Sequence, residues 1–295
     1  MRRRVLWMGL LLASMLFAIC ACENPFPPRN LVERLRPLAV KASPPECGLD
    51  GEVELEALVA DPTGEGRELR FVWAVCLMEL SSAASDIACP GPDSYVLPGE
   101  GPTSQLSMPD LLAWLAEQGF EMTPEHMPPG QELPKTIPLF IGFELRAGEE
   151  LMRGIKRVTV RLDGEASTNI NPRLLGLLID GVEVGDETPC IPAGSTVVMT
   201  PLADETTRDS YIPDGETEPQ LEDFLFSWFS DAGEFKDERS ILDVDSEGRP
   251  LDANEFTAPD ELGPMTIWLL VRDARYGTDW MSWDLEIVAP LPVLE

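Results

Sequence analysis

An acidic loop near the carboxyl end holds the side chains best spaced to bind a metal ion. Residues 243–248 read Asp-Val-Asp-Ser-Glu-Gly, with oxygen-bearing side chains at alternate places and glycine sixth. This spacing is typical of a calcium loop, because calcium prefers carboxylate oxygens and the glycine permits a sharp turn. The pattern then breaks down, since Asn254 holds the twelfth place, where a glutamate is expected. A plain Asp- and Gly-rich turn is the favoured interpretation. The alternative is a stabilising calcium site formed by Asp243, Asp245, Glu247 and Asp252.

A second candidate group is aromatic. Trp268, Tyr276 and Trp280 cluster near the last predicted hairpin. Strand alternation predicts that Trp268 faces away from the apolar residues on either side of it, and so is exposed. Exposed aromatic side chains can stack on sugars or anchor a protein partner. Packing against a neighbouring domain is the more common role, and both interpretations stay open.

The cysteines predict disulfides and no metal or redox chemistry. Cys76 and Cys89 bracket a short polar stretch, so we expect a local bridge between them, which leaves Cys47 and Cys190 to link the two halves. The chain has no Cys-x-x-Cys pair and a single histidine, His126, which argues against zinc and thiol-redox sites. Nucleophile-elbow, phosphate-loop and dinucleotide motifs are also missing from the sequence. We therefore expect a non-enzymatic protein with no cofactor apart from the calcium considered above.

The elements that carry these residues are mainly β-strands. Residues 52–59 alternate between glutamate and apolar side chains, the pattern of a half-buried strand. Residues 69–77 predict the next strand, with Trp73 filling the gap between two sheets. Residues 139–145 and 155–162 flank a glycine turn and predict a closing hairpin.

The second half of the chain repeats the order of these features. A cysteine-to-glycine turn precedes a short apolar strand at 47–51 and again at 190–194, and the strands that contain Trp73 and Trp228 follow each turn. Several correspondences in one order indicate a duplicated domain. Only the first half carries a helix signal, a proline and an acid at the start of residues 108–119. That helix either covers an open end of a sandwich or presents a surface to a partner.

Three short motifs follow one another in the second half. A tryptophan and a glycine turn occupy 227–235, Phe-Thr-Ala-Pro occupies 256–259, and a strand ending in Val-x-Asp occupies 267–273. In this order they resemble bacterial immunoglobulin-like and PKD-like domains, over residues 174–288. The resemblance implies a β-sandwich used as a spacer or binding module, and it names no ligand, because function belongs to sites and not to this fold.

Residues 1–22 have the layout of an export signal. Three arginines are followed by an apolar run at 5–19, too short for a comfortable membrane span, and by Ile-Cys-Ala-Cys at 19–22. This ending is similar to the lipobox of bacterial lipoproteins, which implies cleavage after Ala21 and acylation, including palmitate, at Cys22. An ordinary cleaved signal with an incidental cysteine is the alternative.

Charge excludes one class of partner. The 52 acidic and 22 basic residues give a formal net charge of -30, which repels nucleic acid. The hydrophobic share of 44% and charged share of 25% are those of a globular chain.

These observations predict a mainly β protein of two immunoglobulin-like antiparallel β-sandwiches. The expected segments are a signal at 1–21, a Pro-rich tether at 22–30, a first domain with the helical insertion at 31–165, and a second domain at 166–295. We expect a membrane-anchored lipoprotein of the cell envelope, in the outer rather than the inner membrane, acting as a non-enzymatic structural or binding module for an envelope protein or a glycan. The alternative function is a carbohydrate-binding accessory or hydrolase-associated surface protein.

Overall fold

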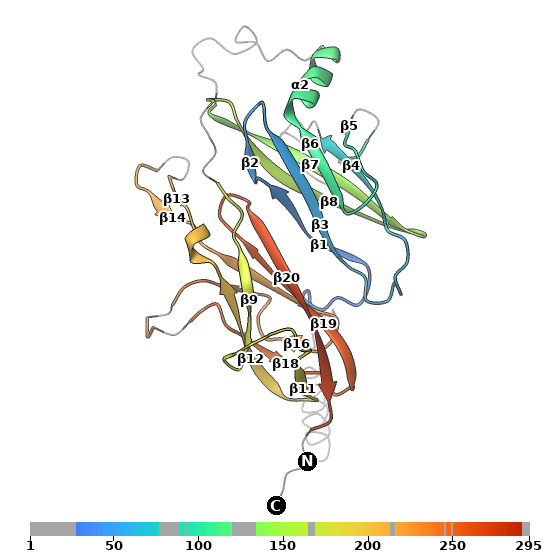
Figure 1. Cartoon of the computed structure of the whole chain (residues 1–295), viewed down its shortest axis with the longest axis vertical. Helices are drawn as coiled ribbons and strands as arrows, with labels where there is room; N and C mark the ends of the chain where they lie inside the picture. The colour runs from blue at the N-terminus through green and yellow to red at the C-terminus, as the bar shows by residue number, and fades with distance from the viewer. Residues whose placement is uncertain are drawn as a thin grey trace, which may run out of the picture.

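Antiparallel β-sheets make up most of the molecule, as the computed structural model shows (Figure 1). One α-helix and one 3-10 turn interrupt the strands in the described part of the chain. The mainly β fold class predicted from the sequence is confirmed. The described residues are 28–76, 89–91, 94–119, 134–164, 169–212, 216–244, 246–248 and 250–290.

The first sandwich, β1 to β8, packs two sheets around one core. Their strand orders are β1-β3-β6 and β2-β8-β7-β4-β5. Sequence alternation builds the core: Val53 and Leu55 of β3 are buried, while the glutamates between them are exposed. Strand β2 runs parallel to β8, and the other pairings are antiparallel. The strands are β1 Arg36–Ser43, β2 Glu46–Cys47, β3 Glu52–Ala60, β4 Arg70–Cys76, β5 Tyr95–Val96, β6 Thr103–Ser107, β7 Thr136–Ala147 and β8 Glu150–Arg161.

The second sandwich, β9 to β20, repeats this arrangement. Its sheets have the orders β10-β9-β12-β18-β16 and β11-β20-β19-β15-β17, and β11 runs parallel to β20 as β2 does to β8. Strands β13 and β14 form a separate two-stranded ribbon. The elements are β9 Leu174–Ile179, β10 Val182–Glu183, β11 Cys190–Pro192, β12 Thr196–Ala203, η2 Glu205–Thr207, β13 Ser210–Tyr211, β14 Gln220–Leu221, β15 Leu225–Ser230, β16 Glu234–Phe235, β17 Arg239–Ile241, β18 Asn254–Thr257, β19 Gly263–Arg272 and β20 Thr278–Val288.

A buried tryptophan occupies the same place in both sandwiches. Trp73 on β4 and Trp228 on β15 are 0% and 1% exposed. Each indole satisfies its one donor inside the fold: Trp73 donates to the Gly101 carbonyl at 3.0 Å and Trp228 to the Ser240 hydroxyl at 2.9 Å. The repeated strand order and the core tryptophan are features of an immunoglobulin-like sandwich.

Helix α2, Met108–Glu117, lies at one end of the first sandwich (Figure 1). The Ser107 hydroxyl accepts a hydrogen bond from the Asp110 backbone N–H at 3.3 Å, so it caps the helix. Met108 and Leu111 are buried in the core of the sandwich. This contact supports the covering role expected for the helix.

The cysteines confirm one predicted bridge and contradict the other. Cys76 and Cys89 form a disulfide across 13 residues of sequence. Cys47 is buried, Cys190 is exposed, and both are free, so the predicted bridge between them is wrong. The reason is the repeat itself: Cys47 lies on β2 and Cys190 on the corresponding β11, so they are two copies of one position in separate sandwiches.

Residues 30–32, which precede the first strand of the first sandwich, contact the second sandwich. The Val32 N–H donates to the Ser230 carbonyl at 2.8 Å, and the Ser230 N–H donates to the Asn30 carbonyl at 3.0 Å. Residues 30–32 therefore pair in parallel with the final residue of β15, through one bridge between Leu31 and Ser230. None of the helices within the described ranges is long and apolar enough to span a membrane.

Candidate functional site

The two sandwiches pack together on the outer face of β19 and β20. Trp268 and Leu270 project from β19 into an apolar cluster with Val32, Leu38 and Ala39 of the first half. Trp268 is only 8% exposed, so the predicted exposure is wrong. Strand alternation does turn Trp268 away from the core of its own sandwich, but the first sandwich covers that face. The packing alternative considered for this residue describes its environment.

Trp280 belongs to the same contact. It is half-buried beside this cluster, and the Lys41 ammonium lies 4.7 Å from its ring centre. The same ammonium is 3.3 Å from the Asp279 carboxylate of the second sandwich. Lys41 therefore covers the ring face that a sugar would need.

Tyr276 is the member of the aromatic group that stays exposed, at 45%. It lies in the turn between β19 and β20 with a φ of 76°, in the left-handed region that non-glycine residues seldom adopt. The Arg157 guanidinium stacks 4.4 Å from its ring centre and donates to its hydroxyl at 2.8 Å. Since Arg157 belongs to β8, this pair joins the two sandwiches at the rim of a cavity.

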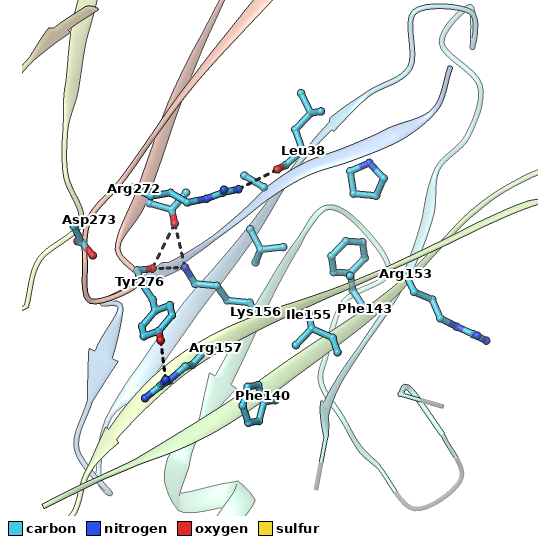
Figure 2. A pocket seen from close by; sticks show the side chains of 15 residues that line it. Leu38, Phe140, Phe143, Arg153, Ile155, Lys156, Arg157, Arg272, Asp273 and Tyr276 are labelled. Atoms are coloured by element: carbon cyan, nitrogen blue, oxygen red, sulfur yellow. Dashed lines mark hydrogen bonds between the residues drawn. The ribbon is translucent and has the colours of Figure 1, made fainter. Parts of the chain in front are cut away.

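The interdomain cavity has a volume of about 580 Å³ and is lined by β1, β7 and β8 of the first sandwich and by β19 and the following turn of the second (Figure 2). Its wall has an apolar part, which includes Phe140, Phe143 and Ile155. The rest of the wall is predominantly cationic. Such a mixed lining can hold a small ligand that has both an apolar and a charged part.

Lys156 is the most deeply buried cation of the cavity. It is 8% exposed, and its ammonium donates to the Tyr276 carbonyl at 2.5 Å and to the Thr278 hydroxyl at 3.2 Å. Burial, with the neighbouring charge of Arg272, lowers the pKa of Lys156 to about 8, and the Asp273 charge opposes this shift only in part. The cavity therefore holds a positive charge that has lost most of its water.

Two arginines share this environment. The Arg272 guanidinium donates to the Leu38 carbonyl at 3.4 Å, and burial together with the Arg239 charge lowers its pKa. The Arg157 Nε is buried without a hydrogen-bond partner. Among the residues that the structure describes, no carboxylate lies within 4.0 Å of the charged nitrogens of Lys156, Arg157 or Arg272, whereas Arg153 at the same wall pairs with Glu144 at 3.0 Å.

Asp273 is the carboxylate of the cavity wall. Burial first, and the Glu222 charge second, raise the pKa of Asp273 to about 6. Its Oδ1 accepts from the backbone N–H groups of Arg275 and Gly277 at 2.8 and 2.7 Å, while its Oδ2 is buried without a partner. The carboxylate thus serves the turn between β19 and β20; its charge acts on Lys156, but it forms no ion pair within 4.0 Å with Lys156, Arg157 or Arg272.

The acidic loop does not assemble a metal site in the part that can be described. The Asp243 carboxylate accepts from the Val244 N–H at 2.7 Å, and Asp252 is buried, which raises its pKa. Asp245 lies outside the described residues. Within the described ranges, no three His, Cys, Asp or Glu side chains gather closely enough to hold a metal ion, Glu247 included. Calcium binding stays a prediction, as does acylation of Cys22, which also lies outside these ranges.

The cationic cavity wall was not predicted from the sequence. One signal could have pointed to it: Lys156 occupies the inward register of β8, in step with the buried Val158 and Val160. A lysine at an inward position needs a partner, because its charge is costly to bury alone. Arg272 could not be associated with it, since 116 positions of sequence separate them and no pattern connects two domains.

Comparisons with known proteins add little. The sequence matches no family model and no curated protein. Solved structures align with most of the chain at low similarity. Dimeric latent PorU from Porphyromonas gingivalis aligns at 10% identity and a TM-score of 0.24, over 88% of this chain and 24% of its own. Three N-terminal domains of the bacteriophage RB49 Highly Immunogenic Outer Capsid protein align at 10% identity and a TM-score of 0.22, over 88% of this chain and 71% of their own. Adhesin InvE of Yersinia pseudotuberculosis aligns at 9% identity and a TM-score of 0.21, over 84% of this chain and 58% of its own. These similarities carry no functional argument.

Proposed function

We propose that the chain is an exported lipoprotein of the cell envelope, anchored through Cys22, whose two sandwiches form a non-enzymatic structural and binding module. The lipobox-like ending at 19–22 supports the anchor. The lack of catalytic motifs in the sequence supports the non-enzymatic role. We place the protein in the outer membrane.

The contact between the two sandwiches is the observation that supports the role as a structural and binding module. Neighbouring domains move by default unless their interface is extensive and well packed. Here an apolar cluster around Trp268 is bordered by hydrogen bonds between the two sandwiches. The Asn171 amide donates to the Ala42 carbonyl at 2.8 Å and accepts from the Thr278 N–H at 2.9 Å, so one side chain joins both halves. A fixed angle between two sandwiches suits a spacer or a scaffold.

The carbohydrate-binding alternative has less support. Stacking on a sugar needs an accessible aromatic face. Trp268 is covered by the first sandwich and Trp280 by Lys41, which leaves Tyr276 stacked on Arg157. No observation favours this second function.

Acylation is tested by comparing Cys22→Ser with Cys190→Ser in cells fed an alkyne-bearing palmitate analogue. We expect the wild-type chain and Cys190→Ser to take up the label and sediment with membranes, since Cys190 is an exposed free thiol in the second sandwich. Cys22→Ser should lose the label and keep the uncleaved mass. Density-gradient separation of the membranes then assigns the inner or outer one. The anchor would be refuted if Cys22→Ser had the same mass as the wild-type chain, took up the label as fully and sedimented with the membranes.

The module role is tested by crosslinking in intact cells, followed by pull-down of the full-length chain and mass spectrometry. A partner recovered in stoichiometric amount supports a scaffold, and it should be lost when the interface variant Trp268→Ala replaces the wild type. Turnover of a glycan or peptide substrate by the purified chain would refute the non-enzymatic role.

A further inference from the structure

The cations of the interdomain cavity are unusual for this chain. Acidic residues outnumber basic ones 52 to 22, so a cation placed at random would readily find a carboxylate. Arg67, Arg70 and Arg161 illustrate this, since each is held by acidic side chains within 3.2 Å. Lys156, Arg157 and Arg272 have none, although they share one cavity. Their joint position therefore calls for a chemical reason.

Burial makes the charges of Lys156 and Arg272 costly to the folded protein, since it lowers the pKa of both groups. Lys156 is 8% exposed, and the Arg157 Nε has neither water access nor a hydrogen-bond acceptor. A buried cation without an ion-pair partner destabilises a fold, because its lost hydration is only partly replaced. An oxyanion in the cavity would supply an ion-pair partner for the arginines and an acceptor for the Arg157 Nε.

The arrangement of the lining narrows the ligand further. Figure 2 shows Lys156 and Arg157 close to Tyr276, and Phe140 lies beside Arg157 as its partner across β7 and β8, so apolar and cationic side chains are neighbours in the wall. The volume of about 580 Å³ falls within the range typical of small-molecule sites. A ligand that fits this mixed lining is small and combines an anionic group with an apolar group.

We propose that the interdomain cavity binds a small carboxylate or phosphate monoester with an apolar group. Arg157 and Arg272 would hold the oxyanion, and Lys156 would fix the turn that carries Tyr276 while adding its charge. Arg153 remains bound to Glu144, and Asp273 remains bound to the backbone of its own turn. The site goes beyond the proposed envelope role and does not depend on the lipid anchor.

Isothermal titration of the full-length chain in nonionic detergent, with detergent alone as the blank, tests the site. The probes are phenylacetate, phenyl phosphate, inorganic phosphate, and 2-phenylethanol as the neutral analogue of phenylacetate. We expect phenylacetate or phenyl phosphate to bind and 2-phenylethanol not to bind. Arg157→Gln and Arg272→Gln should each weaken binding by about tenfold, the effect of losing one charge-assisted contact.

The matched control is Arg70→Gln, because Arg70 is exposed on the first sandwich and pairs with Glu68 away from the cavity wall. It should bind as the wild type does, and circular-dichroism melts verify that all three variants are folded. The proposal is overturned if neither phenylacetate nor phenyl phosphate binds at concentrations up to about 10 mM, because a dissociation constant above that value is too weak for a built site. It is also overturned if 2-phenylethanol binds as well as phenylacetate, or if Arg70→Gln weakens binding as much as Arg157→Gln. Any of these results would leave the anchored module intact, since that role is tested separately through Cys22.

Discussion

Truncating Trp268 to alanine should uncouple the two sandwiches without unfolding either one. The side chain is 8% exposed and lies in the apolar cluster between them, outside both sandwich cores. Replacing a buried tryptophan with alanine typically costs about 3–5 kcal/mol, from lost transfer free energy and the cavity left behind. Here that cost falls on the contact between sandwiches, because each core keeps its own tryptophan, Trp73 or Trp228.

Differential scanning calorimetry of the full-length chain measures this coupling. We expect one cooperative transition for the wild type and two separated transitions for Trp268→Ala. Trp114→Ala is the control, since Trp114 lies on α2 against Tyr95, with ring centres 5.4 Å apart, away from the second sandwich. It should lower the stability of the first sandwich and leave the coupling in place. A single transition at the wild-type midpoint for Trp268→Ala would show that the cluster does not hold the sandwiches together.

Three further predictions concern single features of the fold. Replacing Cys76 and Cys89 together by alanine should lower the free energy of unfolding by about 3 kcal/mol, as expected for a loop of this size; equal urea midpoints for the variant and the oxidised wild type would contradict this. Asp273 has its pKa raised to about 6 by burial, so its protonated form stabilises the fold at acid pH and that stabilisation is lost as pH rises through 6. Asp273→Asn should therefore match the wild type below pH 4 and exceed it by up to about 3 kcal/mol above pH 7, and parallel pH–stability curves would disprove the assignment. If the acidic loop holds calcium, the melting temperature should fall when EGTA replaces calcium chloride, and Asp243→Asn should abolish that difference; identical midpoints in both buffers would exclude the ion.

Features that depend on one sandwich were predictable from the sequence. The glutamate alternation of β3, the capped start of α2 and the Cys76–Cys89 bridge all rest on local spacing, and the structure confirms them. The matching positions of Trp73 and Trp228 likewise followed from the repeated order of features. In each case the signal lies within one sandwich or in the order of elements along the chain.

Features that depend on both sandwiches were only partly predictable. Alternation places Trp268 on the outer face of β19 and favoured packing against a neighbouring domain, but nothing local indicates which residues cover that face. The error with Cys47 and Cys190 has the same origin, because spacing along the chain does not tell equivalent positions from adjacent ones. The cationic cavity wall could not be predicted for the same reason, since Lys156 and Arg272 come from different sandwiches.

The short stretch at 30–32 that bonds to Ser230 has a consequence for how the molecule would stand on a bilayer. From Cys22 to Arg29 the backbone can reach roughly 25 Å when fully extended. Val32 belongs to the apolar cluster between the sandwiches, so a lipid on Cys22 would tether the molecule at its interdomain contact and not at the far end of either sandwich. Residues 30–32 would also reach their final position only after the carboxyl half had been exported and folded, so the attachment point would be completed last.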